Sequence, residues 1–248
     1  MSNEKNVLIT GAARRLGSLI AEDLAASGYF VWIHYRSHRN EAAALKTRIL
    51  SVGGSAECVQ ADLSSVDEIN AMLDFISNSE NRGLSALINN ASVFTAGTIR
   101  STSAADWDHV MNTNLRSVWY LSTQAAERFQ TIENIISIGD SSVSFGYSEH
   151  AVYGLSKFAL KYLTEQMAAA FSPRIRVNLL SPGYVLRGNF EPEAAWEQRV
   201  SKTLTNNDGI VASVLNGIRF LLSDSGMTGT EMIIDNGLQL YGKKSNMK

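Results

Sequence analysis

A tyrosine and a lysine, Tyr153 and Lys157, stand four residues apart at the start of a long amphipathic stretch. On a helix, residues four apart share a face, so the Lys157 ammonium can lie below the Tyr153 phenol. A nearby positive charge favours phenolate and lowers the pKa of a tyrosine. Tyr153 is therefore a candidate proton donor near neutral pH.

Asp140 stands thirteen residues before Tyr153, just after the apolar run Ile135–Ile138, which predicts a buried strand. The carboxyl group could simply cap or end that strand. Alternatively, it could share a proton network with Tyr153, and the two acids would then titrate as a coupled pair. A neighbouring phenolate and the nearby Lys157 would act on the carboxyl group in opposite directions, so its ionisation state stays open.

The composition describes a globular protein without a strong charge bias. The chain has 248 residues, of which 45% are hydrophobic and 19% charged, and its net charge is -2. This length fits one domain, and the weak charge argues against a nucleic-acid partner bound through its phosphates. The single cysteine, Cys58, suits a reducing compartment. No segment predicts a signal peptide or a spanning helix of about 20 apolar residues, so we expect a cytoplasmic protein with no membrane partner.

Short β-branched runs alternate with helical patterns along the chain. Strands are predicted at Asn6–Thr10, Phe30–Tyr35, Ala56–Ala61, Ala86–Asn89, Asn134–Ile138, Arg176–Leu180 and Glu231–Asp235. Helices are predicted near Arg15–Ser27, Asn40–Val52, Ser65–Asn78, Ala104–Phe129, Ala151–Phe171 and Asp208–Leu222. This alternation predicts an α/β fold, a single Rossmann-type doubly wound parallel sheet of about seven strands with helices on both faces.

No linker divides the chain, so residues 1–248 are expected to form one domain. The least regular segment is residues 183–207, which follows a predicted strand end. Open α/β sheets bind ligands beyond such strand ends. We therefore interpret this segment as a substrate lid, with a plain surface insertion as the alternative.

The first predicted strand leads into a turn that begins at Gly11 and ends at Gly17. Gly11 can adopt backbone angles that other residues resist. Exposed amides at a helix start attract a pyrophosphate, and Gly17 would allow a helix to pack closely on the strand. The turn is thus a candidate dinucleotide site, although an ordinary strand-to-helix connection is possible.

The second predicted strand ends in Tyr35, followed by Arg36 and Ser37. Dinucleotide-binding folds place an acidic residue here to bind the ribose of NAD. No carboxylate is available, whereas a guanidinium and a hydroxyl suit the 2′-phosphate of NADP. The missing acid favours NADP(H) over NAD(H) as the cofactor, with a solvated basic loop as the structural alternative.

Together, the glycine turn and the Tyr-x-x-x-Lys segment resemble the short-chain dehydrogenase/reductase family over almost the whole chain. Most of that family has serine thirteen residues before the tyrosine, and aspartate there is similar to its pteridine and dihydromonapterin reductases. Three further segments resemble the same branch: Gly11–Gly17, in which Arg15 replaces the middle glycine, His34–Ser37 and Asn90–Phe94.

The resemblance implies roles for particular residues. The NADP(H) site would include Gly11, Arg14, Arg15, Leu16, Gly17, Tyr35, Arg36, Ser37, Asp62, Leu63, Asn90, Ala91, Ser92, Tyr153, Lys157, Pro182 and Gly183. The catalytic residues would be Asp140, Tyr153, Lys157 and Asn114. A pterin would contact Arg15, Ser92, Phe94, Asp140, Tyr153, Tyr184 and Leu186, with Phe190 and Trp196 as further pocket walls.

In this resemblance, Lys157 would bind the nicotinamide ribose, Asn114 would support a proton relay and Phe94 would stack on the pterin. Structural alternatives stay open for several residues. Asp62 could be a helix-start acid, Asn114 could bend its helix around a bound water, and Phe94 could belong to the core.

The resemblance implies an NADPH-dependent reductase that transfers a hydride to a dihydropterin C=N bond. A carboxyl group fits protonation of a ring nitrogen better than the serine hydrogen bond used on ketones. The alternatives are an NADPH-dependent carbonyl reductase, such as a 3-ketoacyl carrier-protein reductase, and a non-catalytic NADP-binding sensor. Which pterin is used, and whether folates or carbonyls are the true substrate, stays open.

Two further expectations concern metals and assembly. The four histidines lack ligand spacing, so no metal is expected. The resemblance, together with the two long helices near Ala104–Phe129 and Ala151–Phe171, predicts a homotetramer with two-fold contacts.

Overall fold

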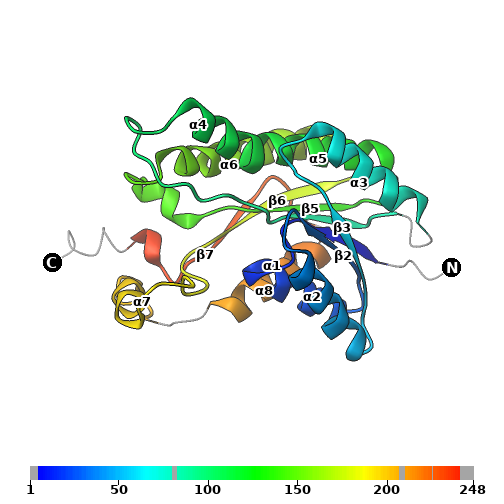
Figure 1. Cartoon of the computed structure of the whole chain (residues 1–248), viewed down its shortest axis with the longest axis horizontal. Coiled ribbons are helices and arrows are strands. Elements are labelled where there is room, and N and C mark those ends of the chain that lie inside the picture. Colours follow the sequence, from blue (N-terminus) through cyan, green and yellow to red (C-terminus); the bar gives the residue numbers. More distant parts are fainter. Residues whose placement is uncertain (1–4, 80–82, 207–209, 225, 241–248) are drawn as a thin grey trace.

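The computed structural model describes residues 5–79, 83–206, 210–224 and 226–240. Within these ranges the chain forms one seven-stranded sheet with the order β3-β2-β1-β4-β5-β6-β7, and neighbouring strands are parallel (Figure 1). The strands are β1 (Asn6–Ile9), β2 (Phe30–Tyr35), β3 (Ser55–Gln60), β4 (Ala86–Asn89), β5 (Asn134–Ile138), β6 (Arg176–Pro182) and β7 (Glu231–Ile234). The predicted doubly wound parallel sheet is confirmed.

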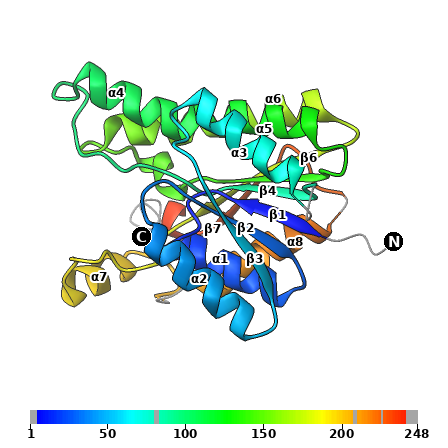
Figure 2. The ribbon, with the colours of Figure 1, turned by 45° about the vertical axis from the view of Figure 1, so that its right-hand side comes forward.

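Helices cover both faces of this sheet, as Figures 1 and 2 show. One face carries α1 (Arg15–Ala26), α2 (Arg39–Ser51) and α8 (Val211–Ser223). The other carries α3 (Val66–Asn78), α4 (Ala104–Met111), α5 (Ser117–Arg128) and α6 (Ala151–Phe171). Alternate strand residues point to opposite faces, so Val7 and Ile9 of β1 join one core and Leu8 joins the other.

The order of the strands reverses between β1 and β4. After β1 the chain runs outward to β3 and then returns to β4 on the other side of β1. In such sheets ligands bind beyond the carboxyl ends of the strands at this point. The segments that follow β1, β2, β4, β5 and β6 therefore converge there, and they carry the predicted site residues.

The predicted helix Ala104–Phe129 is divided in the structure. A π-helical turn, Asn112–Arg116, separates α4 from α5. Such a turn inserts an extra residue into the helical ladder and is frequent at functional sites. Here Asn114 is buried and pairs twice with the backbone of Val93, which follows β4. A continuous amphipathic pattern does not reveal this local widening.

The segment predicted as an irregular lid contains a short helix, α7 (Glu193–Val200). Its side chains Trp196 and Val200 are buried, so apolar packing holds it in place. Residue 207 of the predicted lid and residues 208 and 209 of the next predicted helix lie outside the described residues. Among the described helices, none combines the length and apolar character needed to cross a membrane.

Candidate active site

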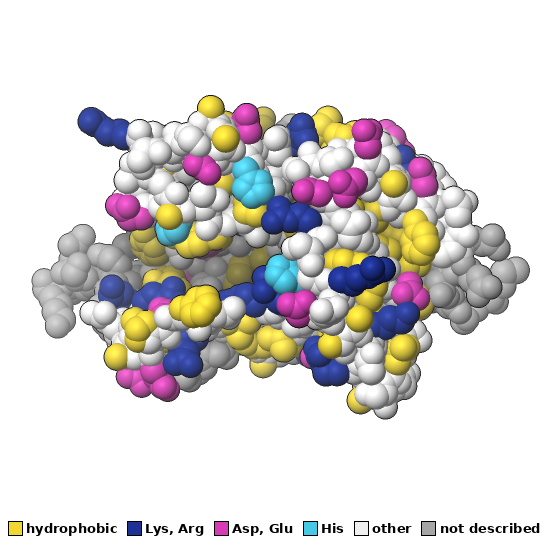
Figure 3. Space-filling view, in the orientation of Figure 1, with side chains coloured by type: hydrophobic (Ala, Val, Ile, Leu, Met, Phe, Trp, Pro, Cys, Tyr) yellow, Lys and Arg dark blue, Asp and Glu magenta, His cyan; other side chains and the backbone are white. Residues whose placement is uncertain are grey.

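A cavity of about 870 Å³ opens at the carboxyl edge of the sheet. Figure 3 shows the molecule hollowed there, with basic side chains beside the opening. All residues predicted to bind cofactor or substrate line this cavity. Of the predicted catalytic residues, Asn114 alone does not line it, although its neighbour Thr113 does.

The turn from Gly11 to Gly17 lies at one end of the cavity, and both of its glycines occupy positions that disfavour a side chain. Gly11 has a φ of +63°, in the left-handed region. A Cβ added to Gly17 would lie 2.3 Å from the Gly11 carbonyl oxygen, so α1 packs directly on the turn. The predicted close packing at Gly17 is confirmed by this geometry.

The His34 side chain also holds the glycine turn, a role that the sequence analysis missed. The buried imidazole accepts a hydrogen bond from the Gly11 N–H at 3.0 Å and donates one to the Ala61 carbonyl at 3.0 Å. Burial lowers the pKa of His34 to about 4, so the ring stays neutral and can accept from Gly11. A histidine inside the otherwise apolar strand β2, one residue before Tyr35, was the available signal.

The end of β2 is open to solvent at the other side of the turn. Arg36 and Ser37 are exposed and line the cavity. Asp62 lies nearby; burial raises its pKa, but hydrogen bonds from Ser64 and the charge of Arg36 outweigh that effect and lower it overall. One Asp62 oxygen accepts from both the amide and the hydroxyl of Ser64, while Ser65 caps α3.

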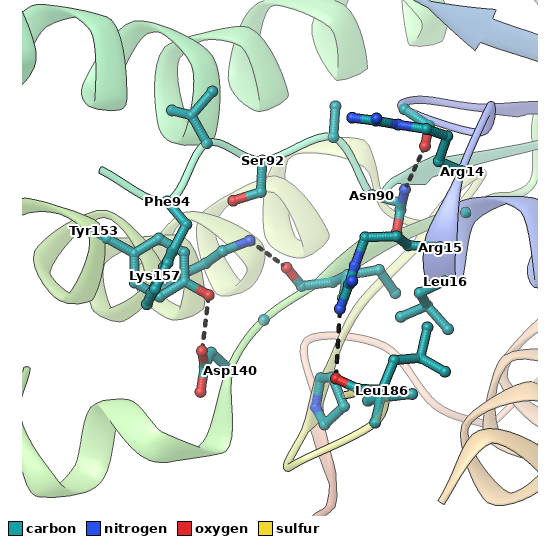
Figure 4. Close-up of a pocket in the computed structure, with 18 of the residues that line it drawn as sticks. Arg14, Arg15, Leu16, Asn90, Ser92, Phe94, Asp140, Tyr153, Lys157 and Leu186 are labelled. Carbon is teal, nitrogen blue, oxygen red and sulfur yellow. Dashed lines mark hydrogen bonds between the residues drawn. The ribbon is translucent and has the colours of Figure 1, made fainter. Parts of the chain in front are cut away.

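Asp140 is the centre of a hydrogen-bonded cluster at the opposite end of the cavity. Its Oδ2 atom accepts from the Tyr153 hydroxyl at 2.7 Å (Figure 4). The same atom accepts from the Tyr147 hydroxyl at 2.8 Å. Its Oδ1 atom accepts from the Ser142 amide at 2.8 Å, because Asp140 caps the short 3-10 helix Ser141–Phe145. The two interpretations of Asp140 thus hold together: it ends the strand and also contacts Tyr153.

The pKa of Tyr153 differs from the sequence-based expectation. It is raised, first by burial and then by the negative charge and hydrogen bonding of Asp140. Lys157 donates instead to the Ile138 carbonyl at 2.7 Å, and its ammonium lies 5.9 Å from the centre of the Tyr153 ring. The prediction that Lys157 lowers the pKa of Tyr153 is therefore wrong for this geometry; Tyr153 keeps its proton at neutral pH.

Burial also acts on Lys157 itself. It lowers the pKa of the ammonium to about 8, against the opposing charge of Asp140. The Lys157 ammonium lines the cavity, and its lowered pKa brings the loss of its proton closer to neutral pH. Perturbed titrating groups of this kind, gathered in one cleft, are typical of catalytic sites.

Asn114 fixes the segment that follows β4. Its Nδ2 donates to the Val93 carbonyl at 2.9 Å and its Oδ1 accepts from the Val93 amide at 2.8 Å. Nδ2 also contacts the Ser156 hydroxyl at 3.2 Å. Asn114 therefore positions Ser92 and Phe94 through the residue between them.

Phe94 is 56% exposed, so the alternative of a core phenylalanine is wrong, and the prediction that it stacks on a substrate stays a prediction. Its ring stacks on His150, with centroids 3.8 Å apart, and meets the Tyr153 ring edge-on at 4.6 Å. His150 is held by the Thr95 carbonyl, 3.0 Å from its Nδ1 atom. These contacts leave an aromatic surface beside the Asp140 cluster.

Arg15 reaches across to the lid. It adopts a left-handed φ of +53°, and its guanidinium donates to the Asn189 side chain at 3.0 Å and to the Leu186 and Arg187 carbonyls at 3.4 Å (Figure 4). On the inner side of the lid, Arg199 lies over the rings of Tyr184 and Trp196, which both line the cavity. Phe190 is 99% exposed, so its prediction as a pocket wall is wrong.

Comparisons with known proteins agree with this architecture. A family model described as enoyl-(acyl carrier protein) reductase matches residues 11–239. Dihydromonapterin reductase from Escherichia coli (strain SMS-3-5 / SECEC) is 29% identical over 94% of this chain and 96% of its own. The 3-oxoacyl-[acyl-carrier-protein] reductase of Staphylococcus aureus (strain Mu50) is 27% identical over 97% of this chain and its whole length.

Among solved structures, the chain resembles FolM alternative dihydrofolate reductase 1 from Brucella canis, complexed with NADP. The TM-score is 0.90 at 30% identity, and the match covers 97% of this chain and 96% of that one. A short-chain dehydrogenase from Burkholderia cenocepacia, also in complex with NADP, matches with a TM-score of 0.84 at 30% identity over 94% and 97% of the two chains.

Proposed function

This chain belongs to the short-chain dehydrogenase/reductase family, and from that premise we propose that it is an NADPH-dependent reductase acting on the C=N bond of dihydropterins. The observation that carries the proposal is the carboxyl group of Asp140, 2.7 Å from the Tyr153 hydroxyl. A carboxyl group beside a phenol fits protonation of a ring nitrogen better than a serine hydrogen bond does.

The cavity has the features that NADP(H) requires. The turn from Gly11 to Gly17 leads into the start of α1, where backbone amides would attract a pyrophosphate, and neither glycine carries a side chain that would block its approach. Arg36 and Ser37 would hold the 2′-phosphate, and Lys157 would hold the nicotinamide ribose. Related chains from Brucella canis and Burkholderia cenocepacia were crystallised with NADP.

The bound cofactor would supply the hydride. The chain's own residues would orient the substrate and supply the proton. Phe94 offers an exposed ring on which a flat heterocycle can stack. Tyr153 holds its proton at neutral pH because burial and Asp140 raise its pKa, so it can act as donor. Asp140 orients the Tyr153 hydroxyl toward the cavity and shares the proton that the ring nitrogen receives.

A carbonyl reductase is the second candidate. The likeness to a 3-oxoacyl-[acyl-carrier-protein] reductase over the full length supports it, as does the description of the matching family model. Tyr153, Lys157 and Asn114 would serve either reaction. Asp140 and the exposed Phe94 favour the pterin.

The test is a comparison of substrates under identical conditions. NADPH oxidation would be measured with dihydromonapterin, dihydrobiopterin, dihydrofolate and a β-ketoacyl thioester. We expect the highest kcat/KM with a dihydropterin. A higher kcat/KM with the thioester would overturn the proposal in favour of the carbonyl reductase.

A further inference from the structure

Tyr147 has no assigned role, yet it shares a single carboxylate oxygen with Tyr153. Its hydroxyl donates to Asp140 Oδ2 at 2.8 Å, and the Tyr153 hydroxyl donates to the same atom at 2.7 Å. The two rings meet edge-on with centroids 5.4 Å apart. Asp140 thus connects two phenols rather than one.

Helix α6 leaves space for the Tyr147 ring. Gly154 follows Tyr153 in that helix, where glycine costs about 1 kcal/mol relative to alanine. A Cβ added to Gly154 would lie 3.2 Å from Tyr147 Cδ2 and 3.3 Å from its Cβ. The glycine therefore leaves room for the Tyr147 ring beside the first turn of α6.

The two phenols differ in their access to solvent. Tyr153 is 8% exposed and Lys157 is 5% exposed. Tyr147 is only partly buried, and it follows an exposed glycine, Gly146. Of the two tyrosines that bond Asp140 Oδ2, Tyr147 is therefore the more exposed to water.

We infer that Tyr147 is a positioning residue that returns protons from solvent to the Asp140–Tyr153 pair. The inference rests on the proposed reduction. For each hydride that reaches the carbon of a C=N bond, one proton leaves the pair and forms the N–H bond. Tyr147 then gives its hydroxyl proton to Asp140 Oδ2, and Asp140 passes a proton on to the Tyr153 oxygen. Tyr147 regains a proton from solvent, so the three groups end each turnover unchanged.

Other groups face this cluster and belong to any account of its pH dependence. Tyr153 and Lys157 reach it from α6, and Tyr184 faces it from the segment after β6. Burial and Asp140 raise the pKa of Tyr147, so its hydroxyl keeps its proton at neutral pH. Removing that hydroxyl takes one hydrogen-bond donor from Asp140 Oδ2, and a lost donor disfavours the charged form of an acceptor.

The test is Tyr147→Phe, which keeps the ring and removes the hydroxyl. We expect kcat for dihydropterin reduction to fall about tenfold, less than the loss of a direct general acid, with KM for NADPH unchanged. The acidic limb of the pH profile should move to higher pH, and the solvent isotope effect on kcat should increase. Tyr29→Phe, a half-buried tyrosine before β2, is the matched control and should change none of these.

A second variant, Gly154→Ala, keeps the hydroxyl but displaces the ring, and it should lower kcat in the same direction. An unchanged kcat and pH profile in Tyr147→Phe would overturn the inference, as would a higher substrate KM at constant kcat. If the wild-type protein reduces only the β-ketoacyl thioester, the pterin proposal fails. In that case, the pH profile of kcat for Tyr147→Phe is measured with the thioester. This measurement tests the role of Tyr147 independently of the pterin proposal.

Discussion

The carboxyl group of Asp140 is the shared hydrogen-bond acceptor of the proposed catalytic site. Three donors converge on it, from Tyr153, Tyr147 and the Ser142 amide. Because the phenols are partly or wholly buried, their protons are held more tightly than in water. Asp140 is thus bound into a hydrogen-bonded network with both phenols.

We predict that Asp140→Ser lowers pterin reduction by roughly 10²-fold or more, the scale of a lost general acid. Asp140→Asn, which keeps the shape but cannot release a proton, should lose as much. NADPH binding, measured by fluorescence titration, should hardly change because Asp140 contacts the tyrosines rather than the glycine turn. Full pterin activity in the serine variant, with an unchanged pH profile, would make Asp140 a strand-end residue only.

Arg36 decides the choice of cofactor in our proposal. Loss of a charge-assisted contact to the 2′-phosphate costs roughly 1.5–3 kcal/mol. Arg36→Ala should therefore weaken NADPH binding about tenfold or more and leave NADH binding nearly unchanged. Arg39→Ala, an exposed arginine that does not line the cavity, is the control. Equal losses for both cofactors would contradict the assignment.

At the scale of elements, the Arg15 side chain connects the glycine turn to residues 186–189 of the predicted lid. Arg15 holds a left-handed backbone conformation and bonds residues on the far side of the cavity. A glycine would adopt that conformation without strain. The contact thus couples the first turn of the fold to the segment after β6.

We predict that Arg15→Gly increases amide hydrogen exchange in residues 186–189 while the free energy of unfolding stays the same or rises. Asn189→Ala should loosen the same segment, because it removes the partner at 3.0 Å. Exchange would be followed by mass spectrometry of peptides. Unchanged protection of the lid in both variants would show that buried Trp196 and Val200 hold it alone.

His34 links strand β2 to the same turn and makes its stability depend on pH. Burial lowers the pKa of His34 to about 4. Between that value and the ordinary value of about 6.5, the unfolded chain binds a proton that the folded chain does not. The free energy of unfolding should therefore fall as the pH drops through this window, by up to about 3 kcal/mol.

This prediction can be checked by urea unfolding at a series of pH values. His34→Gln should have a flatter dependence of unfolding free energy on pH in that window. His109→Gln, which replaces an exposed histidine of α4, should keep the wild-type dependence. If the His34 variant keeps the same slope, another group must cause the acid destabilisation.

At the scale of the whole molecule, α5 and α6 present an apolar surface. Trp119, Phe158 and Tyr162 are 49%, 66% and 65% exposed, and Trp119 and Tyr162 line a shared hollow. Exposed apolar patches of this kind mark interaction sites. They support the prediction of a homotetramer with two-fold contacts through these helices.

Light scattering at micromolar concentration should give the mass of a tetramer for the wild-type protein. Phe158→Glu should lower that mass, because it places a charge in the predicted contact. Phe190→Glu, on a fully exposed lid residue, should not. A monomer mass for the wild-type protein would refute the prediction.

The sequence by itself determined the fold class and the membership of the site. Strand and helix patterns have distinct periods, and parallel strands end at one edge of a sheet, so residues after those ends must meet. For this reason Gly11, Arg36, Asp140 and Tyr153 could be placed around one cavity from their positions in the chain.

Only the tertiary structure decided what those side chains do to one another. A pKa depends on burial and on neighbours distant in sequence, which is why the effect on Tyr153 had the opposite sign to the one expected. The roles of His34 and Tyr147 depend on contacts across turns and strands, and the exposure of Phe94 and Phe190 on local packing. Periodicity in one dimension carries no information on such distances, because they arise only when separate segments pack together.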